Sequence, residues 1–177
     1  ERPDKKADYD KNKPYYEGRD PRFEKTIAKN GDTKWPNWNE TALETYQGGA
    51  NAEPLSGGTP TGYYLKKYCQ TSINTTTAKP TTDNHTWIIY RLGEFYLNYA
   101  EALFKYLGTA YATNNEFPIP ANEMVSKTRR RTKVNMPKFP AGLDNKLWWE
   151  KYQNERMVEL AFEGHRFWDV RRWKEGD

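Results

Sequence analysis

Helical periodicity appears only in the second half of this chain, and it limits the fold more than any other feature. The first periodic face consists of Leu92, Phe95, Tyr96, Tyr99, Leu103 and Tyr106. These positions recur at the spacing of one side of an α-helix. Asp83 or Thr86 is a suitable cap for its start, and Gly108 is a suitable end. We therefore predict a helix over residues 87–107, with Ile89 extending its apolar surface.

Two further helices are indicated later in the chain. One covers residues 121–134. It follows the segment 117–120, whose two prolines prevent a preceding helix from continuing into it. Another covers about 144–163 and continues towards Trp173. Its main buried stripe is predicted at Met157, Leu160, Ala161, Gly164 and Trp168. Such a helix is buried on more than one side, and Trp148 near its start is expected in the core.

Residues 1–86 have a different character. They are rich in Gly, Pro, Asn and Thr and show little periodicity, which is typical of loops. Aromatic residues make up 15% of the whole chain and hydrophobic residues only 36%. Aromatic rings are therefore expected to form much of the core and to be available on loops as well. We predict a mostly α-helical fold, with a loop-rich candidate ligand-binding part over 1–86 and a helical scaffold over 87–177.

Several kinds of site lack the residues that they need. Cys69 is the single cysteine, which excludes an internal disulfide and a cysteine-based zinc site. His85 and His165 are eighty residues apart, without a carboxylate or thiol at ligand spacing, and there is no Gly-rich phosphate loop. We therefore expect no metal ion and no other cofactor. No run of about 18 apolar residues is present, so no membrane-spanning helix is expected.

The basic segment 126–133 and the net charge of +4 do not predict a nucleic-acid partner. The segment has five positive charges in eight residues. A nucleic-acid module would add a wider basic face and a recognisable motif. The segment is more typical of a solvated helix face, or of a partner for acidic side chains elsewhere in the fold.

A row of glutamates stands at Glu155, Glu159 and Glu163, on one helical face because four residues is just over one turn. One interpretation is a set of general acid and base carboxylates, but these usually face each other from different segments across a bond. The other is a set of ion pairs that fix the helix against its neighbours, with Arg156 and Arg166 close by in sequence. We favour the ion pairs.

Aromatic residues in the loops are the best candidates for ligand contact. Trp35 and Trp38 flank a proline, with Asn37 and Asn39 beside them, and Tyr46 lies in another polar segment. A sugar ring has an apolar face of C–H groups and an edge of hydroxyls, so a flat aromatic ring and a side-chain amide suit it. We predict that these five residues bind a glycan by stacking and hydrogen bonding. The alternative is that the rings anchor long loops to the body of the protein.

Four segments together resemble one known family. They are "DPRF" (20–23), "TGYYLKKY" (61–68), "RLGEFYLNYAEAL" (91–103) and "NERMVELAFEGHRFWDVRRW" (154–173). In this order they resemble the C-terminal half of the SusD-like (RagB/SusD) outer-membrane nutrient-binding lipoproteins. The segment 117–120 departs from the family, which more often has Pro-Ile-Pro near its C-terminus.

This resemblance implies tetratricopeptide-like helical pairs that support an irregular ligand-binding part. It also implies a lipid-anchored protein on the surface of the outer membrane that acts with a TonB-dependent, SusC-like transporter. Family members bind glycans, or in some cases peptides, and are not enzymes. We expect this chain to be the C-terminal part of such a protein, with the lipid-bearing cysteine in the preceding part, because Cys69 is internal. Ligand residues vary between members, so none is carried over.

Two alternatives remain open at this point. A helical-repeat module would bind a peptide or a protein partner in a concave groove between its helices. A glycoside hydrolase would need two facing carboxylates about 5 to 10 Å apart in a cleft.

Overall fold

The chain divides into two compact units, Glu1–Trp87 and Ile88–Asp177. The computed structural model describes residues 16–33, 35, 40–54 and 58–176. The first unit contains the short helix α2 (Phe23–Thr26) and the strands β1 (Ile27–Lys29) and β2 (Tyr63–Leu65). The strands pair antiparallel, with Ala28 opposite Tyr64. Most of the other described residues of this unit are irregular, as the Gly, Pro, Asn and Thr content indicates.

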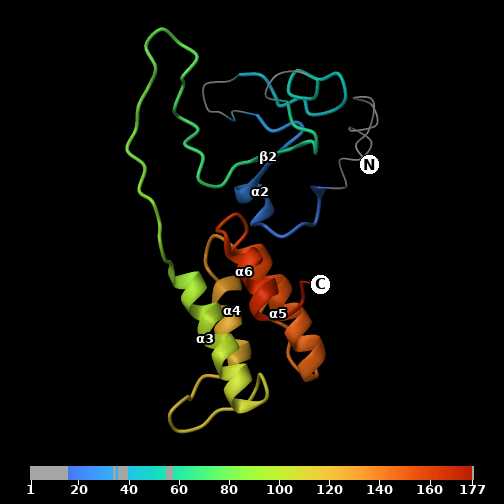
Figure 1. Ribbon diagram of the computed structural model, residues 1–177, viewed down its shortest axis with the longest axis vertical. Helices are drawn as coiled ribbons and strands as arrows, with labels where there is room; N and C mark the ends of the chain where they lie inside the picture. Colours follow the sequence, from blue (N-terminus) through green and yellow to red (C-terminus); the bar gives the residue numbers. More distant parts are fainter. Residues whose placement is uncertain (1–15, 34, 36–39, 55–57, 177) are drawn as a thin grey trace. The chain divides into compact units, whose positions relative to one another are not determined.

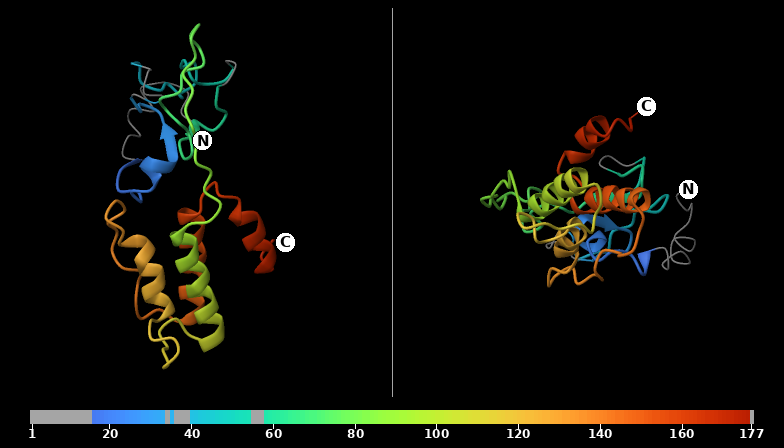
Figure 2. Two further views of the ribbon diagram at one scale, coloured as in Figure 1. Left: turned by 90° about the vertical axis from the view of Figure 1, so that its left-hand side faces the viewer. Right: turned by 90° about the horizontal axis from the view of Figure 1, so that it is seen from below.

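The second unit is helical. It contains α3 (Leu92–Leu107), α4 (Ala121–Arg129), α5 (Asn145–Glu159) and α6 (His165–Arg172). Figures 1 and 2 show α3, α4 and α5 side by side, with α6 leaving the end of α5 at an angle. Regular structure in the described residues is thus mostly helical, with one small two-stranded sheet, and the predicted fold class is confirmed.

Aromatic rings form the centre of the helical core, as the composition predicts. Trp148 and Tyr152 on α5 are completely buried, and so is Leu97 on α3. The ring of Trp148 stacks on Phe104, with centroids 4.6 Å apart, and on Tyr152, with centroids 5.3 Å apart. These stacked rings join α3 to α5 and bury a large apolar area for few residues.

Helix α3 ends as predicted but begins later than predicted. Gly108 follows it with φ of 74°, a left-handed conformation that glycine adopts without a steric cost. The helix begins at Leu92, so Asp83 and Thr86 do not cap it, and Ile89 lies outside it and is exposed. Residues 81–90 are all exposed. Without a packed face, a helical extension there would gain too little to offset its ordering.

The predicted third helix is two helices. The break contains Phe162 with φ of 63° and Gly164 with φ of 80°, and left-handed residues cannot continue a right-handed helix. Of the predicted buried stripe, Met157, Gly164 and Trp168 are exposed, whereas Leu160 is buried as expected. The second predicted helix, over 121–134, is shorter than expected because α4 ends at Arg129.

No helix among the described residues is both long and apolar enough to cross a lipid bilayer.

Candidate functional site

Trp35 is the one predicted stacking tryptophan within the described residues. It is half-buried, and its ring centroid lies 6.1 Å from that of Tyr64, with the ring planes tilted by 38°. Its indole Nε1 is buried and has no hydrogen-bond partner among the described residues. Trp38, Asn37 and Asn39 lie outside the described residues. Their role therefore stays a prediction.

Tyr46, the fifth predicted ligand residue, lies half-buried in an irregular segment. This segment is attached by backbone hydrogen bonds to the turn after β1. The N–H of Gly31 donates to the carbonyl oxygen of Leu43 at 2.8 Å, and the N–H of Leu43 donates to that of Asp32 at 2.9 Å. These hydrogen bonds therefore join the turn that precedes Trp35 to the segment that precedes Tyr46.

Strand β2 presents a tyrosine to each side of the small sheet. Tyr63 lies against Phe23 and Tyr16, with ring centroids 6.4 and 6.3 Å away. Tyr64 contacts Trp35 instead. Successive side chains of a strand point to opposite faces, which explains the separation. The first unit thus has two groups of aromatic rings, held apart by two adjacent residues of one strand.

Tyr64 is a residue that the sequence analysis did not select. Its hydroxyl donates a hydrogen bond to the carbonyl oxygen of Asn51 at 2.7 Å. Burial raises the pKa of Tyr64, and a hydrogen bond with the backbone of Thr59 offsets only part of this rise. The hydroxyl is therefore neutral at physiological pH. Its hydrogen bond to Asn51 holds the Tyr64 ring in contact with Trp35. The aromatic content of the segment 61–68, which is typical of a short strand, is the sequence signal that could have identified Tyr64.

The glutamate row is bound by arginines, and the predicted structural role is confirmed. Arg91, which precedes α3, reaches Glu159 at 2.6 Å and Glu163 at 2.6 Å. Arg129 on α4 reaches Glu155 at 2.6 Å. The partners therefore come mainly from other elements, and not from Arg166 on the same stretch of sequence. These carboxylates accept hydrogen bonds from cations and hold α5 against α3 and α4.

Burial alone would lower the pKa of Arg91, but the hydrogen bonds and charges of Glu163 and Glu159 outweigh it and raise the pKa above its ordinary value. The arginine is therefore always charged. Its charge offsets the cost of burying two carboxylates. Gly93 makes the arrangement possible, because a Cβ there would lie 2.5 Å from Nη1 of Arg91 and 2.8 Å from Oε1 of Glu159.

A second group of buried charges joins α3, α5 and α6. Arg156 on α5 donates to Asp169 on α6 at 2.7 Å. Glu101 on α3 binds the guanidinium of Arg172 and accepts from the indole Nε1 of Trp173 at 2.9 Å. Burial would raise the pKa of Glu101, but these two partners outweigh it and lower the pKa. The carboxylate is therefore charged at neutral pH and links the first helix of this unit to the last.

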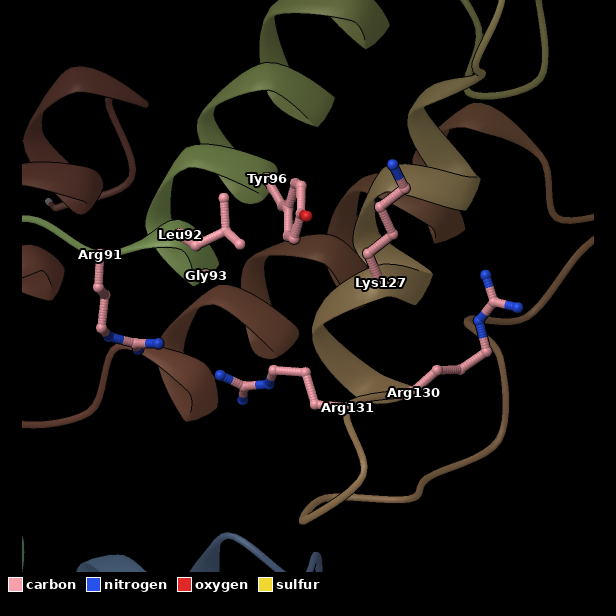
Figure 3. Close-up of a pocket in the computed structure, with 7 residues that line it drawn as sticks. All are labelled: Arg91, Leu92, Gly93, Tyr96, Lys127, Arg130 and Arg131. Atoms are coloured by element: carbon pink, nitrogen blue, oxygen red, sulfur yellow. The ribbon is translucent and has the colours of Figure 1, made fainter.

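A hollow of about 650 Å³ lies between the start of α3 and the end of α4. It is lined by Arg91, Leu92, Gly93, Tyr96, Lys127, Arg130 and Arg131. Figure 3 shows the guanidinium groups of Arg91 and Arg131 directed toward each other, with Tyr96 on α3 and Lys127 on α4 above them. Arg130 points away from the other two arginines. We call this feature the cationic hollow.

In the part of the chain that the structure describes, no three His, Cys, Asp or Glu side chains are placed to hold a metal ion. Cys69 is exposed and is not in a disulfide.

Comparison with known proteins gives the family. A model of the SusD family matches residues 1–177, the whole of this chain. The chain belongs to the SusD family. The crystal structure of a SusD-like protein from Bacteroides fragilis is similar over 91% of this chain, with a TM-score of 0.72 and 32% sequence identity. No curated protein matches the chain.

This SusD-family chain spans about 29% of the length of the Bacteroides fragilis protein. The resemblance that the four sequence segments indicate is confirmed by both comparisons. The helical unit contains two of these segments, and their charged residues Arg91, Glu159 and Arg156 are buried or half-buried. These two segments therefore build the helical scaffold of this unit.

The cationic hollow is not evident from the sequence. Its residues come from the segments 91–96 and 127–131, which are more than thirty positions apart in the sequence. The basic segment 126–133 gave a partial signal, and part of it does bind acidic side chains: Arg131 reaches Glu159 at 2.7 Å. The position of Tyr96 beside this segment depends on the packing of α3 against α4.

Proposed function

We propose that this chain is part of a non-catalytic, glycan-binding subunit of an outer-membrane nutrient uptake system. The observation that carries the proposal is the match to the SusD family over residues 1–177. Proteins of this family bind glycans and act with TonB-dependent, SusC-like transporters. The parent protein would be held at the cell surface by a lipid anchor and would pass its ligand to such a transporter.

The ligand site that we propose is the loop group of Trp35, Trp38, Asn37, Asn39 and Tyr46. Two features of the described residues support it. The ring of Trp35 is backed by Tyr64 at 6.1 Å, which suits a rigid stacking platform. Its buried Nε1 lacks an acceptor among the described residues, and a buried donor normally has a partner, which a bound molecule could supply.

A titration of glycans by calorimetry tests this proposal. We expect the double variant Trp35→Ala/Trp38→Ala to bind a confirmed glycan roughly 30-fold more weakly, because each lost platform costs about 1 kcal/mol. Trp168→Ala is the matched control, since Trp168 is an exposed tryptophan of the helical unit. Equal affinity of the double variant and the control would contradict the proposed site. A glycan panel without any response would contradict glycan binding by this chain.

A helical module that binds a peptide or a protein partner is the second candidate. One observation favours it: Leu92, Phe95 and Tyr106 on one side of α3 are large, apolar and exposed. Helices with such a face commonly pack against another surface. A protein that copurifies with the chain, together with no response to glycans, would support this candidate.

A further inference from the structure

The cationic hollow is lined by four cationic residues and by no acidic residue. Its two converging arginines, Arg91 and Arg131, both bind Glu159, at 2.6 and 2.7 Å. The side chain of Glu159 is only 1% exposed. Arg91 also binds Glu163, whose side chain is 9% exposed, so the carboxylates that pair with these two arginines lie beneath them and the guanidinium groups face the hollow. Arg130 is paired with Glu123, which is not part of the lining.

Part of the hydrogen-bonding capacity in the hollow is unused. Arg131 donates through Nε to the carbonyl oxygen of Thr128 and through Nη2 to Glu159. Its Nη1 has no acceptor among the described residues. A guanidinium has five N–H donors, so a side chain that uses two atoms can still bind an anion. Its side chain is 41% exposed, and these donors are accessible.

Lys127 supplies a cation without a carboxylate partner. Its Nζ lies 5.2 Å from the ring centroid of Tyr96, and it makes no ion pair or hydrogen bond within the part of the chain that the structure describes. An ammonium beside a ring face is attracted to it, but all three of its N–H groups remain free for an acceptor. Lys127 and Tyr96 therefore form one place with a positive group and a flat aromatic surface.

The start of α3 adds to the positive potential. Leu92 and Gly93 are its first two residues, and both line the hollow. Arg91, the residue before them, provides no side-chain cap. The first N–H groups of a helix carry a partial positive charge and favour an anion nearby.

We propose that the cationic hollow binds the carboxylate or sulfate group of an acidic glycan. One anionic group of the glycan would lie beside the converging guanidinium groups of Arg91 and Arg131, and a second beside the ammonium of Lys127, which points away from them (Figure 3). A sugar ring would pack its C–H face on Tyr96. Neutral sugars have no group that uses this charge. The inference rests on the proposed glycan-binding function and adds a substrate class and a second place of contact to it.

The test is a calorimetric titration of the 177-residue chain with three ligands: an oligogalacturonate, the carboxyl-reduced oligosaccharide of the same length, and a sulfated oligosaccharide. We expect at least one acidic ligand to bind more tightly than the reduced one. The difference should shrink as ionic strength rises from about 0.01 M to about 0.15 M, because salt screens exposed charges.

Lys127→Gln is the decisive variant. It removes the free charge, and glutamine keeps the helix, so we expect roughly tenfold weaker binding of the acidic ligand and no change for the neutral one. Lys146→Gln is the matched control for charge. Lys146 is exposed near the start of α5. Its neighbour Asn145 donates a hydrogen bond to the carbonyl oxygen of Gly108, which follows the C-terminal end of α3. The hollow lies at the opposite end of α3, so this control does not touch it.

Each result has a definite meaning. Tight binding of neutral glycans without a preference for acidic ones overturns the inference and leaves the proposed function in place. If no glycan binds, both this inference and the proposed glycan-binding function are contradicted. Equal effects of Lys127→Gln and Lys146→Gln overturn the assignment to the hollow. Polyglutamate that binds as tightly as the acidic glycan, with the same loss in Lys127→Gln, overturns the glycan as ligand.

Discussion

At the scale of single residues, the charged side chains of α5 and α6 determine how firmly the helical unit is held. Arg156 is buried, and the structure places Asp169 against it at 2.7 Å, with Asn98 on its other side. We expect Asp169→Asn to lower the free energy of unfolding by about 3 kcal/mol, because it leaves a buried guanidinium without its carboxylate. Urea denaturation measures this, with Glu150→Gln, an exposed position of α5, as the control. A loss no larger than that of the control would show that the pair contributes little.

At the scale of elements, the ends of the helices follow local chemistry. Asp144 caps α5, and its side chain accepts a hydrogen bond from the N–H of Leu147 at 2.8 Å. We expect Asp144→Ala to reduce stability by about 1 kcal/mol, since one N–H at the start of α5 loses its acceptor. Thermal unfolding followed by circular dichroism measures the change. Asp144→Asn is the control and should retain most of the stability, because asparagine is an equally good cap. If both variants lose the same amount, the charge and not the cap is responsible.

At the scale of the whole helical unit, Glu101 connects α3 to the C-terminal residues Arg172 and Trp173. Its pKa is lowered in the folded chain from an ordinary value of 4.5. A lowered carboxyl pKa contributes stability that is present above the ordinary value and is lost as pH falls through the folded value. We expect the free energy of unfolding to decrease as pH falls below about 4.5. Urea titrations at a series of pH values measure this, and Glu101→Gln should flatten the curve. A variant that keeps the full acid dependence would assign it to other carboxylates.

The sequence by itself determined the features that depend on neighbours along the chain. Periodicity predicted helices at α3, α4 and α5, and Gly108 marked the end of α3 because glycine accepts a left-handed backbone. The glutamate row was interpreted correctly as structural because its members lie on one helical face, whereas catalytic carboxylates usually face each other from different segments. The order of four short segments was sufficient to predict the SusD family.

Only the tertiary structure decided which arginines pair with the glutamate row. Arg91 and Glu159 are 68 positions apart, and no local rule pairs residues at that separation. The late start of α3 likewise depends on where a helix finds a surface to pack against. The break between α5 and α6 lies where Phe162 and Gly164 have a left-handed backbone. The cationic hollow exists because α3 and α4 bring Tyr96 and Lys127 together. Sequence patterns specify which face of each helix is apolar, whereas packing alone specifies which faces meet.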